Sequence, residues 1–288
     1  MRWKPVAAAG ITLALLAGFV TAHLGAQRGP VMFQLAWVDR QGTRTTIGTL
    51  PPGTFAPRVS PDGRRVTFDT GDAAVWIADL ANLAMPRRFA TGRFPMWSAD
   101  GTKLLFAGPN GAQLYWQASD GGGSPELIAE DARAPEQWSA ALGLVSYITL
   151  TGGADYDIWA FSPADGTRKP ILDEPTSAQM SSRFSPDGKW LAYQTNETGR
   201  HEIYVEPFPR TGTRIKVSDA GGERPVWSPD GRELFYDKDA TLFTAAIRAT
   251  PLSARPPVAL PITNFIQAAG RRLWDIAPDG SRFLVMFR

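Results

Sequence analysis

Five arginines stand shortly before copies of a repeated turn motif, and their residue type could support anion binding. They are Arg58, Arg93, Arg183, Arg224 and Arg271. If their side chains converge, the guanidinium groups would bind a carboxylate, a phosphate or an acidic partner segment through charge-assisted hydrogen bonds. The alternative is that they point outward to solvent, where arginines often contribute nothing measurable. The choice between the two depends on the elements that carry these residues.

Sequence patterns of the common catalytic classes are absent. The chain has no Gly-Xaa-Ser-Xaa-Gly hydrolase elbow, no glycine-rich phosphate loop and no His-Arg-Asp kinase pattern. Beyond the first 26 residues it has one histidine, His201, which we expect in a solvated turn, and a lone histidine cannot form a multi-histidine metal site. We therefore predict no catalytic residue and no enzyme activity.

Metal and cysteine chemistry receive little support from the sequence. The chain has no cysteine, which excludes disulfides, thiolate metal sites and a lipoprotein anchor. Acid-rich turns at Asp155-Tyr-Asp157 and Asp237-Lys-Asp239 could hold calcium, although neither has the spacing of an ordered calcium loop. We predict no cofactor and no metal, with calcium as the alternative.

The element that positions all of these residues is a repeated turn. Its five clear copies supply Ser60, Pro61, Asp62, Gly63, Ser98, Asp100, Gly101, Ser185, Pro186, Asp187, Gly188, Ser228, Pro229, Asp230, Gly231, Pro278, Asp279 and Gly280. A degenerate sixth copy, 138–142, precedes Gly143, and the steps between copies are 38, 41, 46, 43 and 49 residues, the length of a four-stranded propeller blade. Proline presets the first corner, aspartate bonds nearby amides and glycine accepts positive φ, so each copy joins two antiparallel strands.

The strands around these turns predict a complete ring. Apolar runs such as 189–193 and 233–236 follow the turns, and further strands are predicted at 75–78, 157–161, 242–245 and, with more polar character, 213–217. Residues 281–288 leave room for only the second strand of the last blade, while 33–38 and 43–50 would supply its outer two. We predict an all-β six-bladed β-propeller over residues 32–288, closed non-covalently by two strands from each end. The five arginines would then line one mouth of its channel.

With these motifs the chain resembles the TolB-like propellers built from PD40 (WD40-like) repeats, over about residues 32–288. Residues 184–247, including Trp190-Leu-Ala-Tyr193 and Trp227-Ser-Pro-Asp-Gly231, are also similar to the extracytoplasmic propellers of some bacterial serine/threonine kinases. The resemblance implies a periplasmic propeller that docks proteins. The family's namesake works in the Tol-Pal envelope system and carries an extra N-terminal α/β domain, for which we expect no room in 288 residues.

The N-terminal segment predicts export. Basic residues 1–4 precede an uncharged, mostly apolar run at 5–22 and then small residues, which is typical of a secretory signal peptide within residues 1–26, cleaved after Ala22 or Ala26. The alternative is an uncleaved membrane anchor at 5–22. Without Arg2 and Lys4, the 30 basic residues become 28, equal to the 28 acids, so the pI of 9.0 gives little support for nucleic-acid binding. We predict a periplasmic or extracellular protein, or one anchored to the membrane.

Three functional hypotheses follow. The first is a non-catalytic, monomeric scaffold that binds a protein partner in the cell envelope, since rigid blades present loops at fixed positions. The second is a sensor that binds a small anionic or glycan ligand, and the third is a propeller enzyme of the lyase or lactonase type that uses carboxylates or a metal. The tryptophans at repeat positions, Trp97, Trp138, Trp190 and Trp227, are predicted to be blade core and not a sugar platform.

Overall fold

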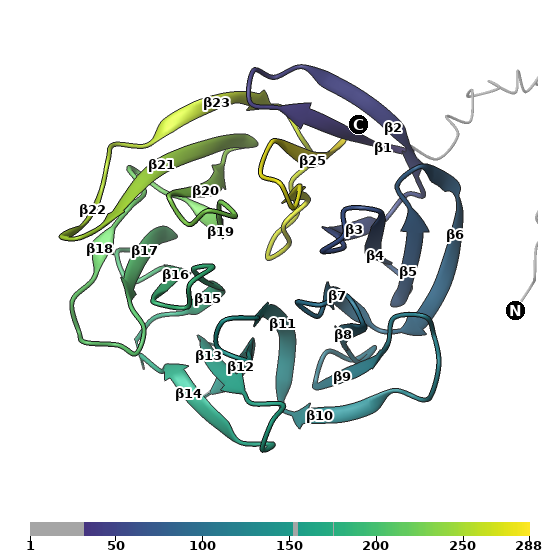
Figure 1. Cartoon of the computed structure of the whole chain (residues 1–288), viewed down its shortest axis with the longest axis horizontal. Helices are drawn as coiled ribbons and strands as arrows, with labels where there is room; N and C mark the ends of the chain where they lie inside the picture. The colour runs from purple at the N-terminus through teal and green to yellow at the C-terminus, as the bar shows by residue number, and fades with distance from the viewer. Residues whose placement is uncertain (1–31, 152–154, 175) are drawn as a thin grey trace, which may run out of the picture. The chain divides into compact units, whose positions relative to one another are not determined.

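The computed structural model describes residues 32–151, 155–174 and 176–288, and these residues form six antiparallel sheets around a common centre (Figure 1). The described residues contain strands and turns but no helix, so none of them belongs to a helix able to cross a bilayer. The prediction of an all-β, six-bladed propeller is confirmed. The expected signal peptide at 1–26, or anchor at 5–22, lies outside the described residues.

The blades follow one another in chain order, each built from the channel outward. Blade 1 has β3 (Thr54–Val59), β4 (Arg65–Thr70), β5 (Ala74–Asp79) and β6 (Asn82–Thr91); blade 2 has β7 (Arg93–Trp97), β8 (Lys103–Ala107), β9 (Gln113–Ala118) and β10 (Glu126–Glu130). Blade 3 has β11 (Ala132–Ser139), β12 (Leu144–Thr151), β13 (Asp155–Phe161) and β14 (Arg168–Leu172); blade 4 has β15 (Gln179–Phe184), β16 (Trp190–Thr195), β17 (Glu202–Pro207) and β18 (Ile215–Lys216). Blade 5 has β19 (Glu223–Trp227), β20 (Glu233–Lys238) and β21 (Thr241–Ala249), with β22 (Leu252–Ala254) and β23 (Val258–Thr263) both paired to β21.

Blade 6 joins the two ends of the described chain. It consists of β24 (Trp274–Ile276), β25 (Arg282–Phe287), β1 (Phe33–Asp39) and β2 (Arg44–Leu50), in that order. Strand β1 runs antiparallel to β25, with Gln34 opposite Phe287 and Asp39 opposite Arg282. The predicted closure by two strands from each end is therefore confirmed.

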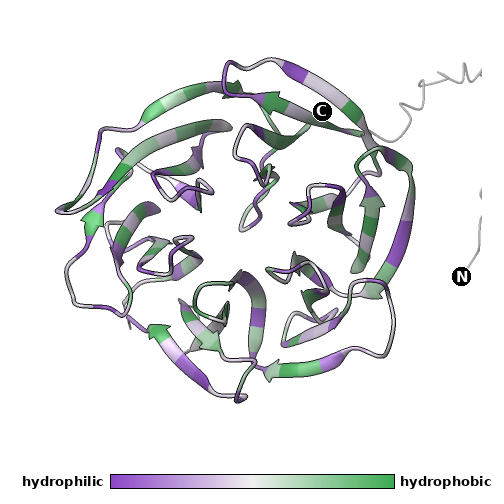
Figure 2. Ribbon diagram, in the orientation of Figure 1, coloured by the Kyte–Doolittle hydropathy of each residue, from purple (hydrophilic) through white to green (hydrophobic). Residues whose placement is uncertain are grey.

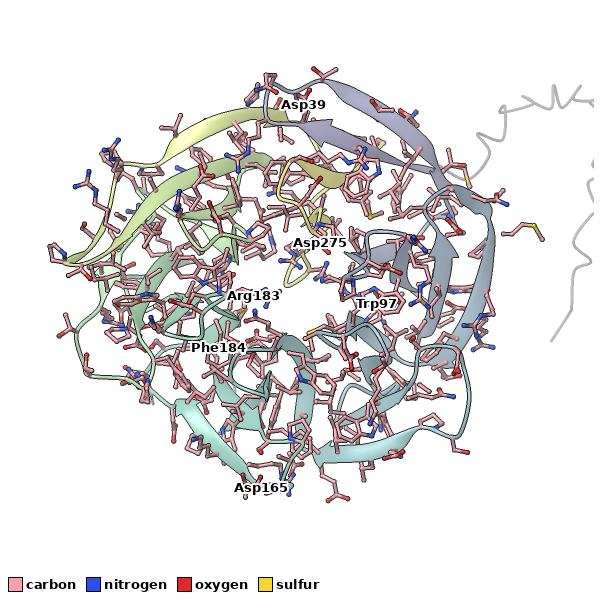
Figure 3. The ribbon with its side chains drawn as sticks, in the orientation of Figure 1. Asp39, Trp97, Asp165, Arg183, Phe184 and Asp275 are labelled. Carbon is pink, nitrogen blue, oxygen red and sulfur yellow. The ribbon has the colours of Figure 1, made fainter. Side chains whose placement is uncertain are left out.

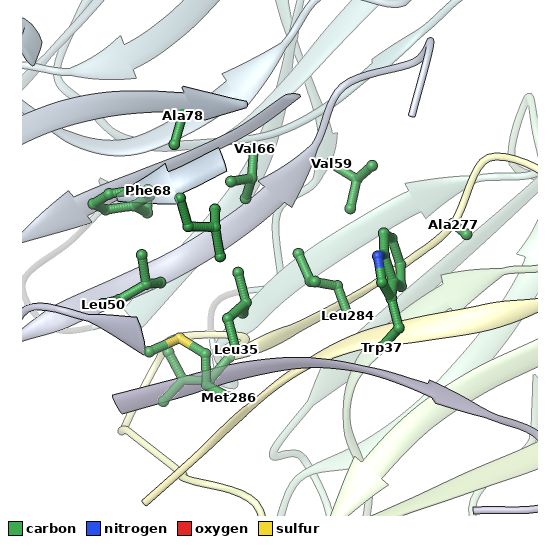
Figure 4. Close-up of a cluster of buried hydrophobic side chains, with 12 residues drawn as sticks. Leu35, Trp37, Leu50, Val59, Val66, Phe68, Ala78, Ala277, Leu284 and Met286 are labelled. Carbon is green, nitrogen blue, oxygen red and sulfur yellow. The ribbon is translucent and has the colours of Figure 1, made fainter. Parts of the chain in front are cut away.

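Side chains of the closing strands pack directly against blade 1. Leu35 and Leu50 from the N-terminal strands share one buried cluster with Met286 of β25 and with Val66 and Phe68 of blade 1 (Figure 4). If the ring opened between blade 6 and blade 1, this shared apolar surface would be exposed to water. The hydrophobic effect therefore favours closure. The non-covalent seam is thus a hydrophobic junction as well as a strand pair.

Strands near the middle of a blade are buried, and the outermost strands are largely exposed. Leu191, Ala192 and Tyr193 are consecutive buried residues of β16, as expected for a strand covered on both faces by neighbouring blades. By contrast, most residues of the outer strand β6 are exposed, and Figure 2 shows a long hydrophilic stretch on it. The outer strand of blade 4 is shorter than predicted, since β18 covers only Ile215–Lys216.

The four clear copies of the repeated turn that contain serine share one hydrogen-bond pattern. In the first copy the Ser60 hydroxyl donates to Asp62 and accepts the amide hydrogen of Arg65 at 2.9 Å, while Asp62 also accepts from the Arg64 amide at 3.0 Å. The Ser60 hydrogen bond lowers the pKa of Asp62. The glycine of every clear copy has a φ between 70° and 73°, which confirms the turn mechanism expected from the sequence.

Neighbouring turns also touch one another around the ring. A β-carbon added at Gly280 would lie 2.9 Å from the Pro229 side chain of the preceding blade, and one at Gly231 would lie 3.4 Å from Pro186. The proline of one turn therefore packs on the glycine of the next. The motif determines the hairpin and also the contact between successive blades at this end of the channel.

Removal of residues 32–50 should open the ring. A chain that begins at Pro51 lacks β1 and β2, so it loses the pairing with β25 and three buried members of the closing cluster, Leu35, Trp37 and Leu50. The cost should match or exceed a domain's total stability of about 5–15 kcal/mol. We expect protease sensitivity and no cooperative transition in thermal unfolding followed by circular dichroism. A chain that begins at Met32 is the control, and a synthetic 32–50 peptide should restore protection. An unchanged midpoint after the deletion would refute closure by these strands.

Replacement of Gly280 by alanine should cost more than the same change at Gly111. Both glycines have positive φ, +72° and +65°, but only Gly280 has a neighbour within 4 Å of the added carbon. We expect about 1–2 kcal/mol for Gly111→Ala from backbone strain alone and about 1–3 kcal/mol more for Gly280→Ala from the clash with Pro229. Urea unfolding measures both, and equal losses would argue against a stabilising contact between turns.

Candidate functional site: an arginine-lined channel

The inner strands place one repeat position at the channel. Ala56, Phe94, Ser181 and Arg224 have positive φ values of 51–58°, and the pairing register of each inner strand shifts beside them. As a result, the residue two positions before each turn serine, or before its equivalent, lines the channel at the end formed by the turns. The residues at this position, in blade order, are Arg58, Met96, Gln137, Arg183, Val226 and Asp275.

Two cavities meet at this level. The first, about 290 Å³, opens at the end where the inner strands begin, and we call it the mouth. Its lining includes six arginines, namely Arg58, Arg133, Arg183, Arg224, Arg271 and Arg272, and a single carboxylate residue, Glu136. The second cavity, about 270 Å³, lies at the turn end and shares Arg58, Arg183 and Arg272 with the first. We call these three residues the throat; Figure 3 shows Arg183 at the inner end of its blade, near Asp275.

The structure brings together four of the five arginines singled out from the sequence. Arg58, Arg183, Arg224 and Arg271 all line the mouth. Arg93 is not among the lining residues; its guanidinium donates to the carbonyl oxygens of Pro109 and Gly71, each at 3.3 Å, and so bridges two loops. Whether any of the five binds a ligand stays a prediction.

Two of the mouth arginines outside the throat are held by carboxylates. Arg224 forms a two-pronged pair with Asp237, with Nε 2.9 Å from Oδ1, and Asp237 also accepts from the Trp274 indole at 2.8 Å. Arg271 Nη1 lies 2.7 Å from Asp69 Oδ2, and its guanidinium stacks over the Phe94 ring. Because these charges are compensated, we assign both arginines mainly to positioning the wall of the mouth.

Two of the three throat arginines, Arg58 and Arg183, lack such compensation, whereas Arg272 pairs with Asp275. Arg58 donates through Nη1 to the carbonyl oxygens of Pro57 and Arg272, and Arg183 donates to the carbonyl of Ser182; neither has an ion pair among the described residues. Burial lowers the pKa of Arg58 well below its usual range, and the Arg272 guanidinium lowers it further. Burial likewise lowers the pKa of Arg183 to about 9, with a second contribution from Arg272. The site therefore concentrates positive charge in a place that disfavours it.

The nearby carboxylates are already occupied by the protein. Both Glu136 oxygens accept amide hydrogens, from Ser181 and Ser182 of the next blade. Asp275 accepts the Val59 amide at 2.8 Å through one oxygen and Arg272 Nη2 at 3.0 Å through the other. Burial raises the pKa of Glu136, although the hydrogen bonds from Ser182 oppose the rise. These carboxylates link blades and leave little acceptor capacity for the throat.

Two repeat tryptophans fix the backbone of the throat. The indole of Trp97 donates to the carbonyl oxygen of Arg58, and that of Trp227 donates to the carbonyl of Arg183, both at 3.0 Å. Both side chains are buried, as predicted for blade core. Trp138 and Trp190 are only half-buried, and Trp138 stacks on Trp116.

The remaining candidates lie outside the throat. His201 is half-buried directly before β17, with Nδ1 3.6 Å from Glu223 Oε1, so it is less solvated than expected. Asp237 of the proposed calcium turn is fully buried against Arg224, and the side chain of Asp155 lies outside the described residues. In the part of the chain that the structure describes, no three His, Asp or Glu side chains are grouped to hold a metal. The calcium alternative stays a prediction.

Sequence reasoning missed four residues of the site, namely Arg133, Glu136, Arg272 and Asp275. The repeat alignment contained a signal for one of them, because Asp275 stands two residues before a turn position, as Arg58 and Arg183 do. The other three stand outside that position. Only the closed ring shows that they reach the same cavity.

Comparison with known proteins agrees with this geometry at the level of fold. No protein-family model matches the sequence. Over 77 residues, 26% of this chain, it is 39% identical to the Tol-Pal system protein TolB of Alcanivorax borkumensis, of which this covers 18%. Over 209 residues, 66% of this chain, it is 28% identical to dipeptidyl-peptidase 5 of Trichophyton schoenleinii, of which this covers 24%. The matches thus span less than a quarter of either relative.

Among solved structures, one described as a TolB from Agrobacterium tumefaciens superposes with a TM-score of 0.70, over 89% of this chain and 98% of that one, at 17% identity. The chain has the TolB-like β-propeller fold. An oligogalacturonate lyase in complex with manganese superposes with a TM-score of 0.58, over 85% of this chain and 80% of that one, at 15% identity. At these sequence identities the comparison shows a shared fold and does not establish a shared activity, because one fold hosts many functions.

Removal of one throat charge should stabilise the free protein. Because the pKa of Arg183 is lowered from its unfolded value to about 9, the charged group is less favourable in the folded chain at pH 7. We expect Arg183→Met to raise the free energy of unfolding by about 1 kcal/mol at pH 7, and the gain should shrink as pH rises through 9, where the wild-type group loses its proton. Urea titrations at pH 7 and 10 measure this, with the exposed Arg232→Met as control. A loss of stability at pH 7 would show that Arg183 is compensated.

Proposed function

We propose that the protein is an exported, non-catalytic β-propeller scaffold of the cell envelope, whose mouth binds an acidic segment of a partner protein. The observation that carries the proposal is the excess of positive charge in the mouth, where six arginines lie in the wall and only Arg224, Arg271 and Arg272 are paired with carboxylates among the described residues. Arg58 and Arg183 have no ion pair among the described residues, and Arg133 donates only to the carbonyl oxygen of Gly111, at 3.2 Å. Guanidinium groups with free donors bind carboxylates through strong, oriented hydrogen bonds.

Two further observations support this proposal. The rigid TolB-like ring presents the mouth arginines at fixed positions, which reduces the entropy lost when a partner segment binds. The segment at 1–26 has the composition of a signal peptide, consistent with export, and the near-equal numbers of acids and bases argue against nucleic acid as the partner. We propose a monomer that is attached to the membrane only if residues 5–22 remain uncleaved.

A second candidate is a sensor for a small anionic or glycan ligand. The volume of the mouth, about 290 Å³, favours this alternative, since it is close to the lower end of small-molecule pockets. A propeller enzyme of the lyase or lactonase type is a third candidate. The carboxylate in the mouth, Glu136, has both oxygens occupied by backbone amides, so the geometry favours binding over proton transfer.

Loss of mouth charge should weaken partner binding. We expect a double variant, Arg133→Gln with Arg183→Gln, to bind an Asp/Glu-rich peptide at least about tenfold more weakly than wild type, because charge-assisted hydrogen bonds are worth about 1.5–3 kcal/mol each. Fluorescence anisotropy with the labelled peptide measures the dissociation constant, and the Asn/Gln version of the peptide tests the charge requirement. Crosslinking in the envelope fraction should lose the same partner in the variant.

The control is Arg232→Gln, which removes the same charge from a side chain that is 84% exposed outside the mouth. It should leave peptide binding unchanged. Equal binding of the acidic and amide peptides, or no effect of the double variant, would refute the proposal. Binding of small anions or acidic sugars, detected as an increase in Tm without any peptide binding, would favour the sensor.

A further inference from the structure

The three throat arginines converge on one region of the channel from three different blades. Arg58 lies on β3 of blade 1, and Arg183 lies on β15 of blade 4, on the opposite side of the ring. Arg272 stands two residues before the start of β24 in blade 6. All three line both cavities, and Arg58 Nη1 is 3.1 Å from the carbonyl oxygen of Arg272. Arg272 lowers the pKa of both other guanidiniums, as expected for like charges held close together.

Arg272 carries buried donors that have no acceptor in the described part of the chain. Its side chain is 6% exposed, and Nη2 donates to Asp275 at 3.0 Å. Nε and Nη1 of the same guanidinium are buried and have no hydrogen-bond partner among the described residues. A buried donor without an acceptor is costly, and more so when it carries charge. The throat therefore holds a cation whose free donors require an acceptor from outside the chain.

The two other guanidiniums leave donors free in the same cavities. The hydrogen bonds of Arg58 use only Nη1, and the hydrogen bond of Arg183 also uses Nη1. The Arg58 cross-strand neighbour is Thr67, and that of Arg183 is Ala192, neither of which is an acid. With Glu136 and Asp275 engaged by backbone amides, the throat keeps an excess of positive charge and of N–H groups.

The arrangement selects among anions by shape and charge. A carboxylate is planar, carries one charge and presents two oxygens, which suits one or two guanidiniums. A tetrahedral phosphate carries more than one negative charge at neutral pH and presents oxygens in several directions, so it can accept from three guanidiniums that approach from three blades. We propose that the throat is a binding site for a phosphate group, either the free ion or a phosphate monoester that reaches in from the mouth. This goes beyond the proposed function, because it assigns a second ligand to the channel.

Calorimetric titration of the full chain with inorganic phosphate tests the site. We expect saturable binding with one site per chain and an increase in Tm, whereas acetate at matched ionic strength should give no comparable shift. Arg58→Met and Arg183→Met should each weaken phosphate binding at least about tenfold, as expected for the loss of one charge-assisted contact. Arg272→Met should do the same if it folds, and the first two variants decide the matter if it does not.

Two control variants separate this site from the acidic-segment site. Arg232→Met removes an exposed charge and should leave phosphate affinity unchanged. Arg133→Gln alters the mouth but not the throat, so it should weaken the acidic peptide while phosphate binding persists. Phenyl phosphate identifies the source of the ligand: tighter binding than inorganic phosphate indicates a monoester, and weaker binding indicates the free ion. Acetate binding as tight as phosphate, or unchanged phosphate affinity in folded Arg58→Met and Arg183→Met, would overturn the proposal.

Discussion

The pairing of β1 with β25 is the constraint on which the channel depends. It joins strands from the two ends of the described chain and buries Leu35 beside Met286 and Phe68. Once the ring is closed, each blade has two neighbours and no inner strand can move away from the axis without disturbing both. Arg58 and Arg183, on opposite blades, are therefore held at a distance determined by the ring and not by loops, which is the kind of rigidity that precise ligand binding requires.

Buried carboxylates and amides reinforce the ring by accepting hydrogen bonds from the next blade. Asp275 of blade 6 accepts from Val59 of blade 1, and Gln194 of blade 4 accepts from Arg224 of blade 5 at 2.7 Å. Such links satisfy amide groups that the bulges of the inner strands free from the β-ladder. They also use carboxylate oxygens that could otherwise accept hydrogen bonds from the throat arginines. The links that stabilise the ring thus also leave guanidinium donors free in its channel.

The fold could be predicted from the sequence because its signal is repeated. Each Ser-Pro-Asp-Gly copy encodes a local hairpin, and the spacing of the copies, together with the strands at 33–38 and 43–50, predicts the number of blades and their closure. The site is less predictable, because in five of the six inner strands the register shift that accompanies the channel-lining position is not visible in the sequence. Arg93 and Arg58 look alike in sequence, yet Arg93 begins its strand and bridges loops while Arg58 lines the throat. Position within the repeat, and not residue type, separates them.

Position within the repeat also explains which arginines are neutralised. Nine residues after the turn serine, blades 1 and 5 carry Asp69 and Asp237 on their second strands, and these acids pair with Arg271 and Arg224 near the start of the inner strands. Two residues closer to the turn, the second strand carries Thr67 in blade 1 and Ala192 in blade 4. These residues lie opposite Arg58 and Arg183. An acid at this level would have neutralised the throat as it does the wall of the mouth. Its absence from both opposing blades leaves two unpaired guanidiniums across the channel from each other, which stability alone does not favour and which anion binding would require.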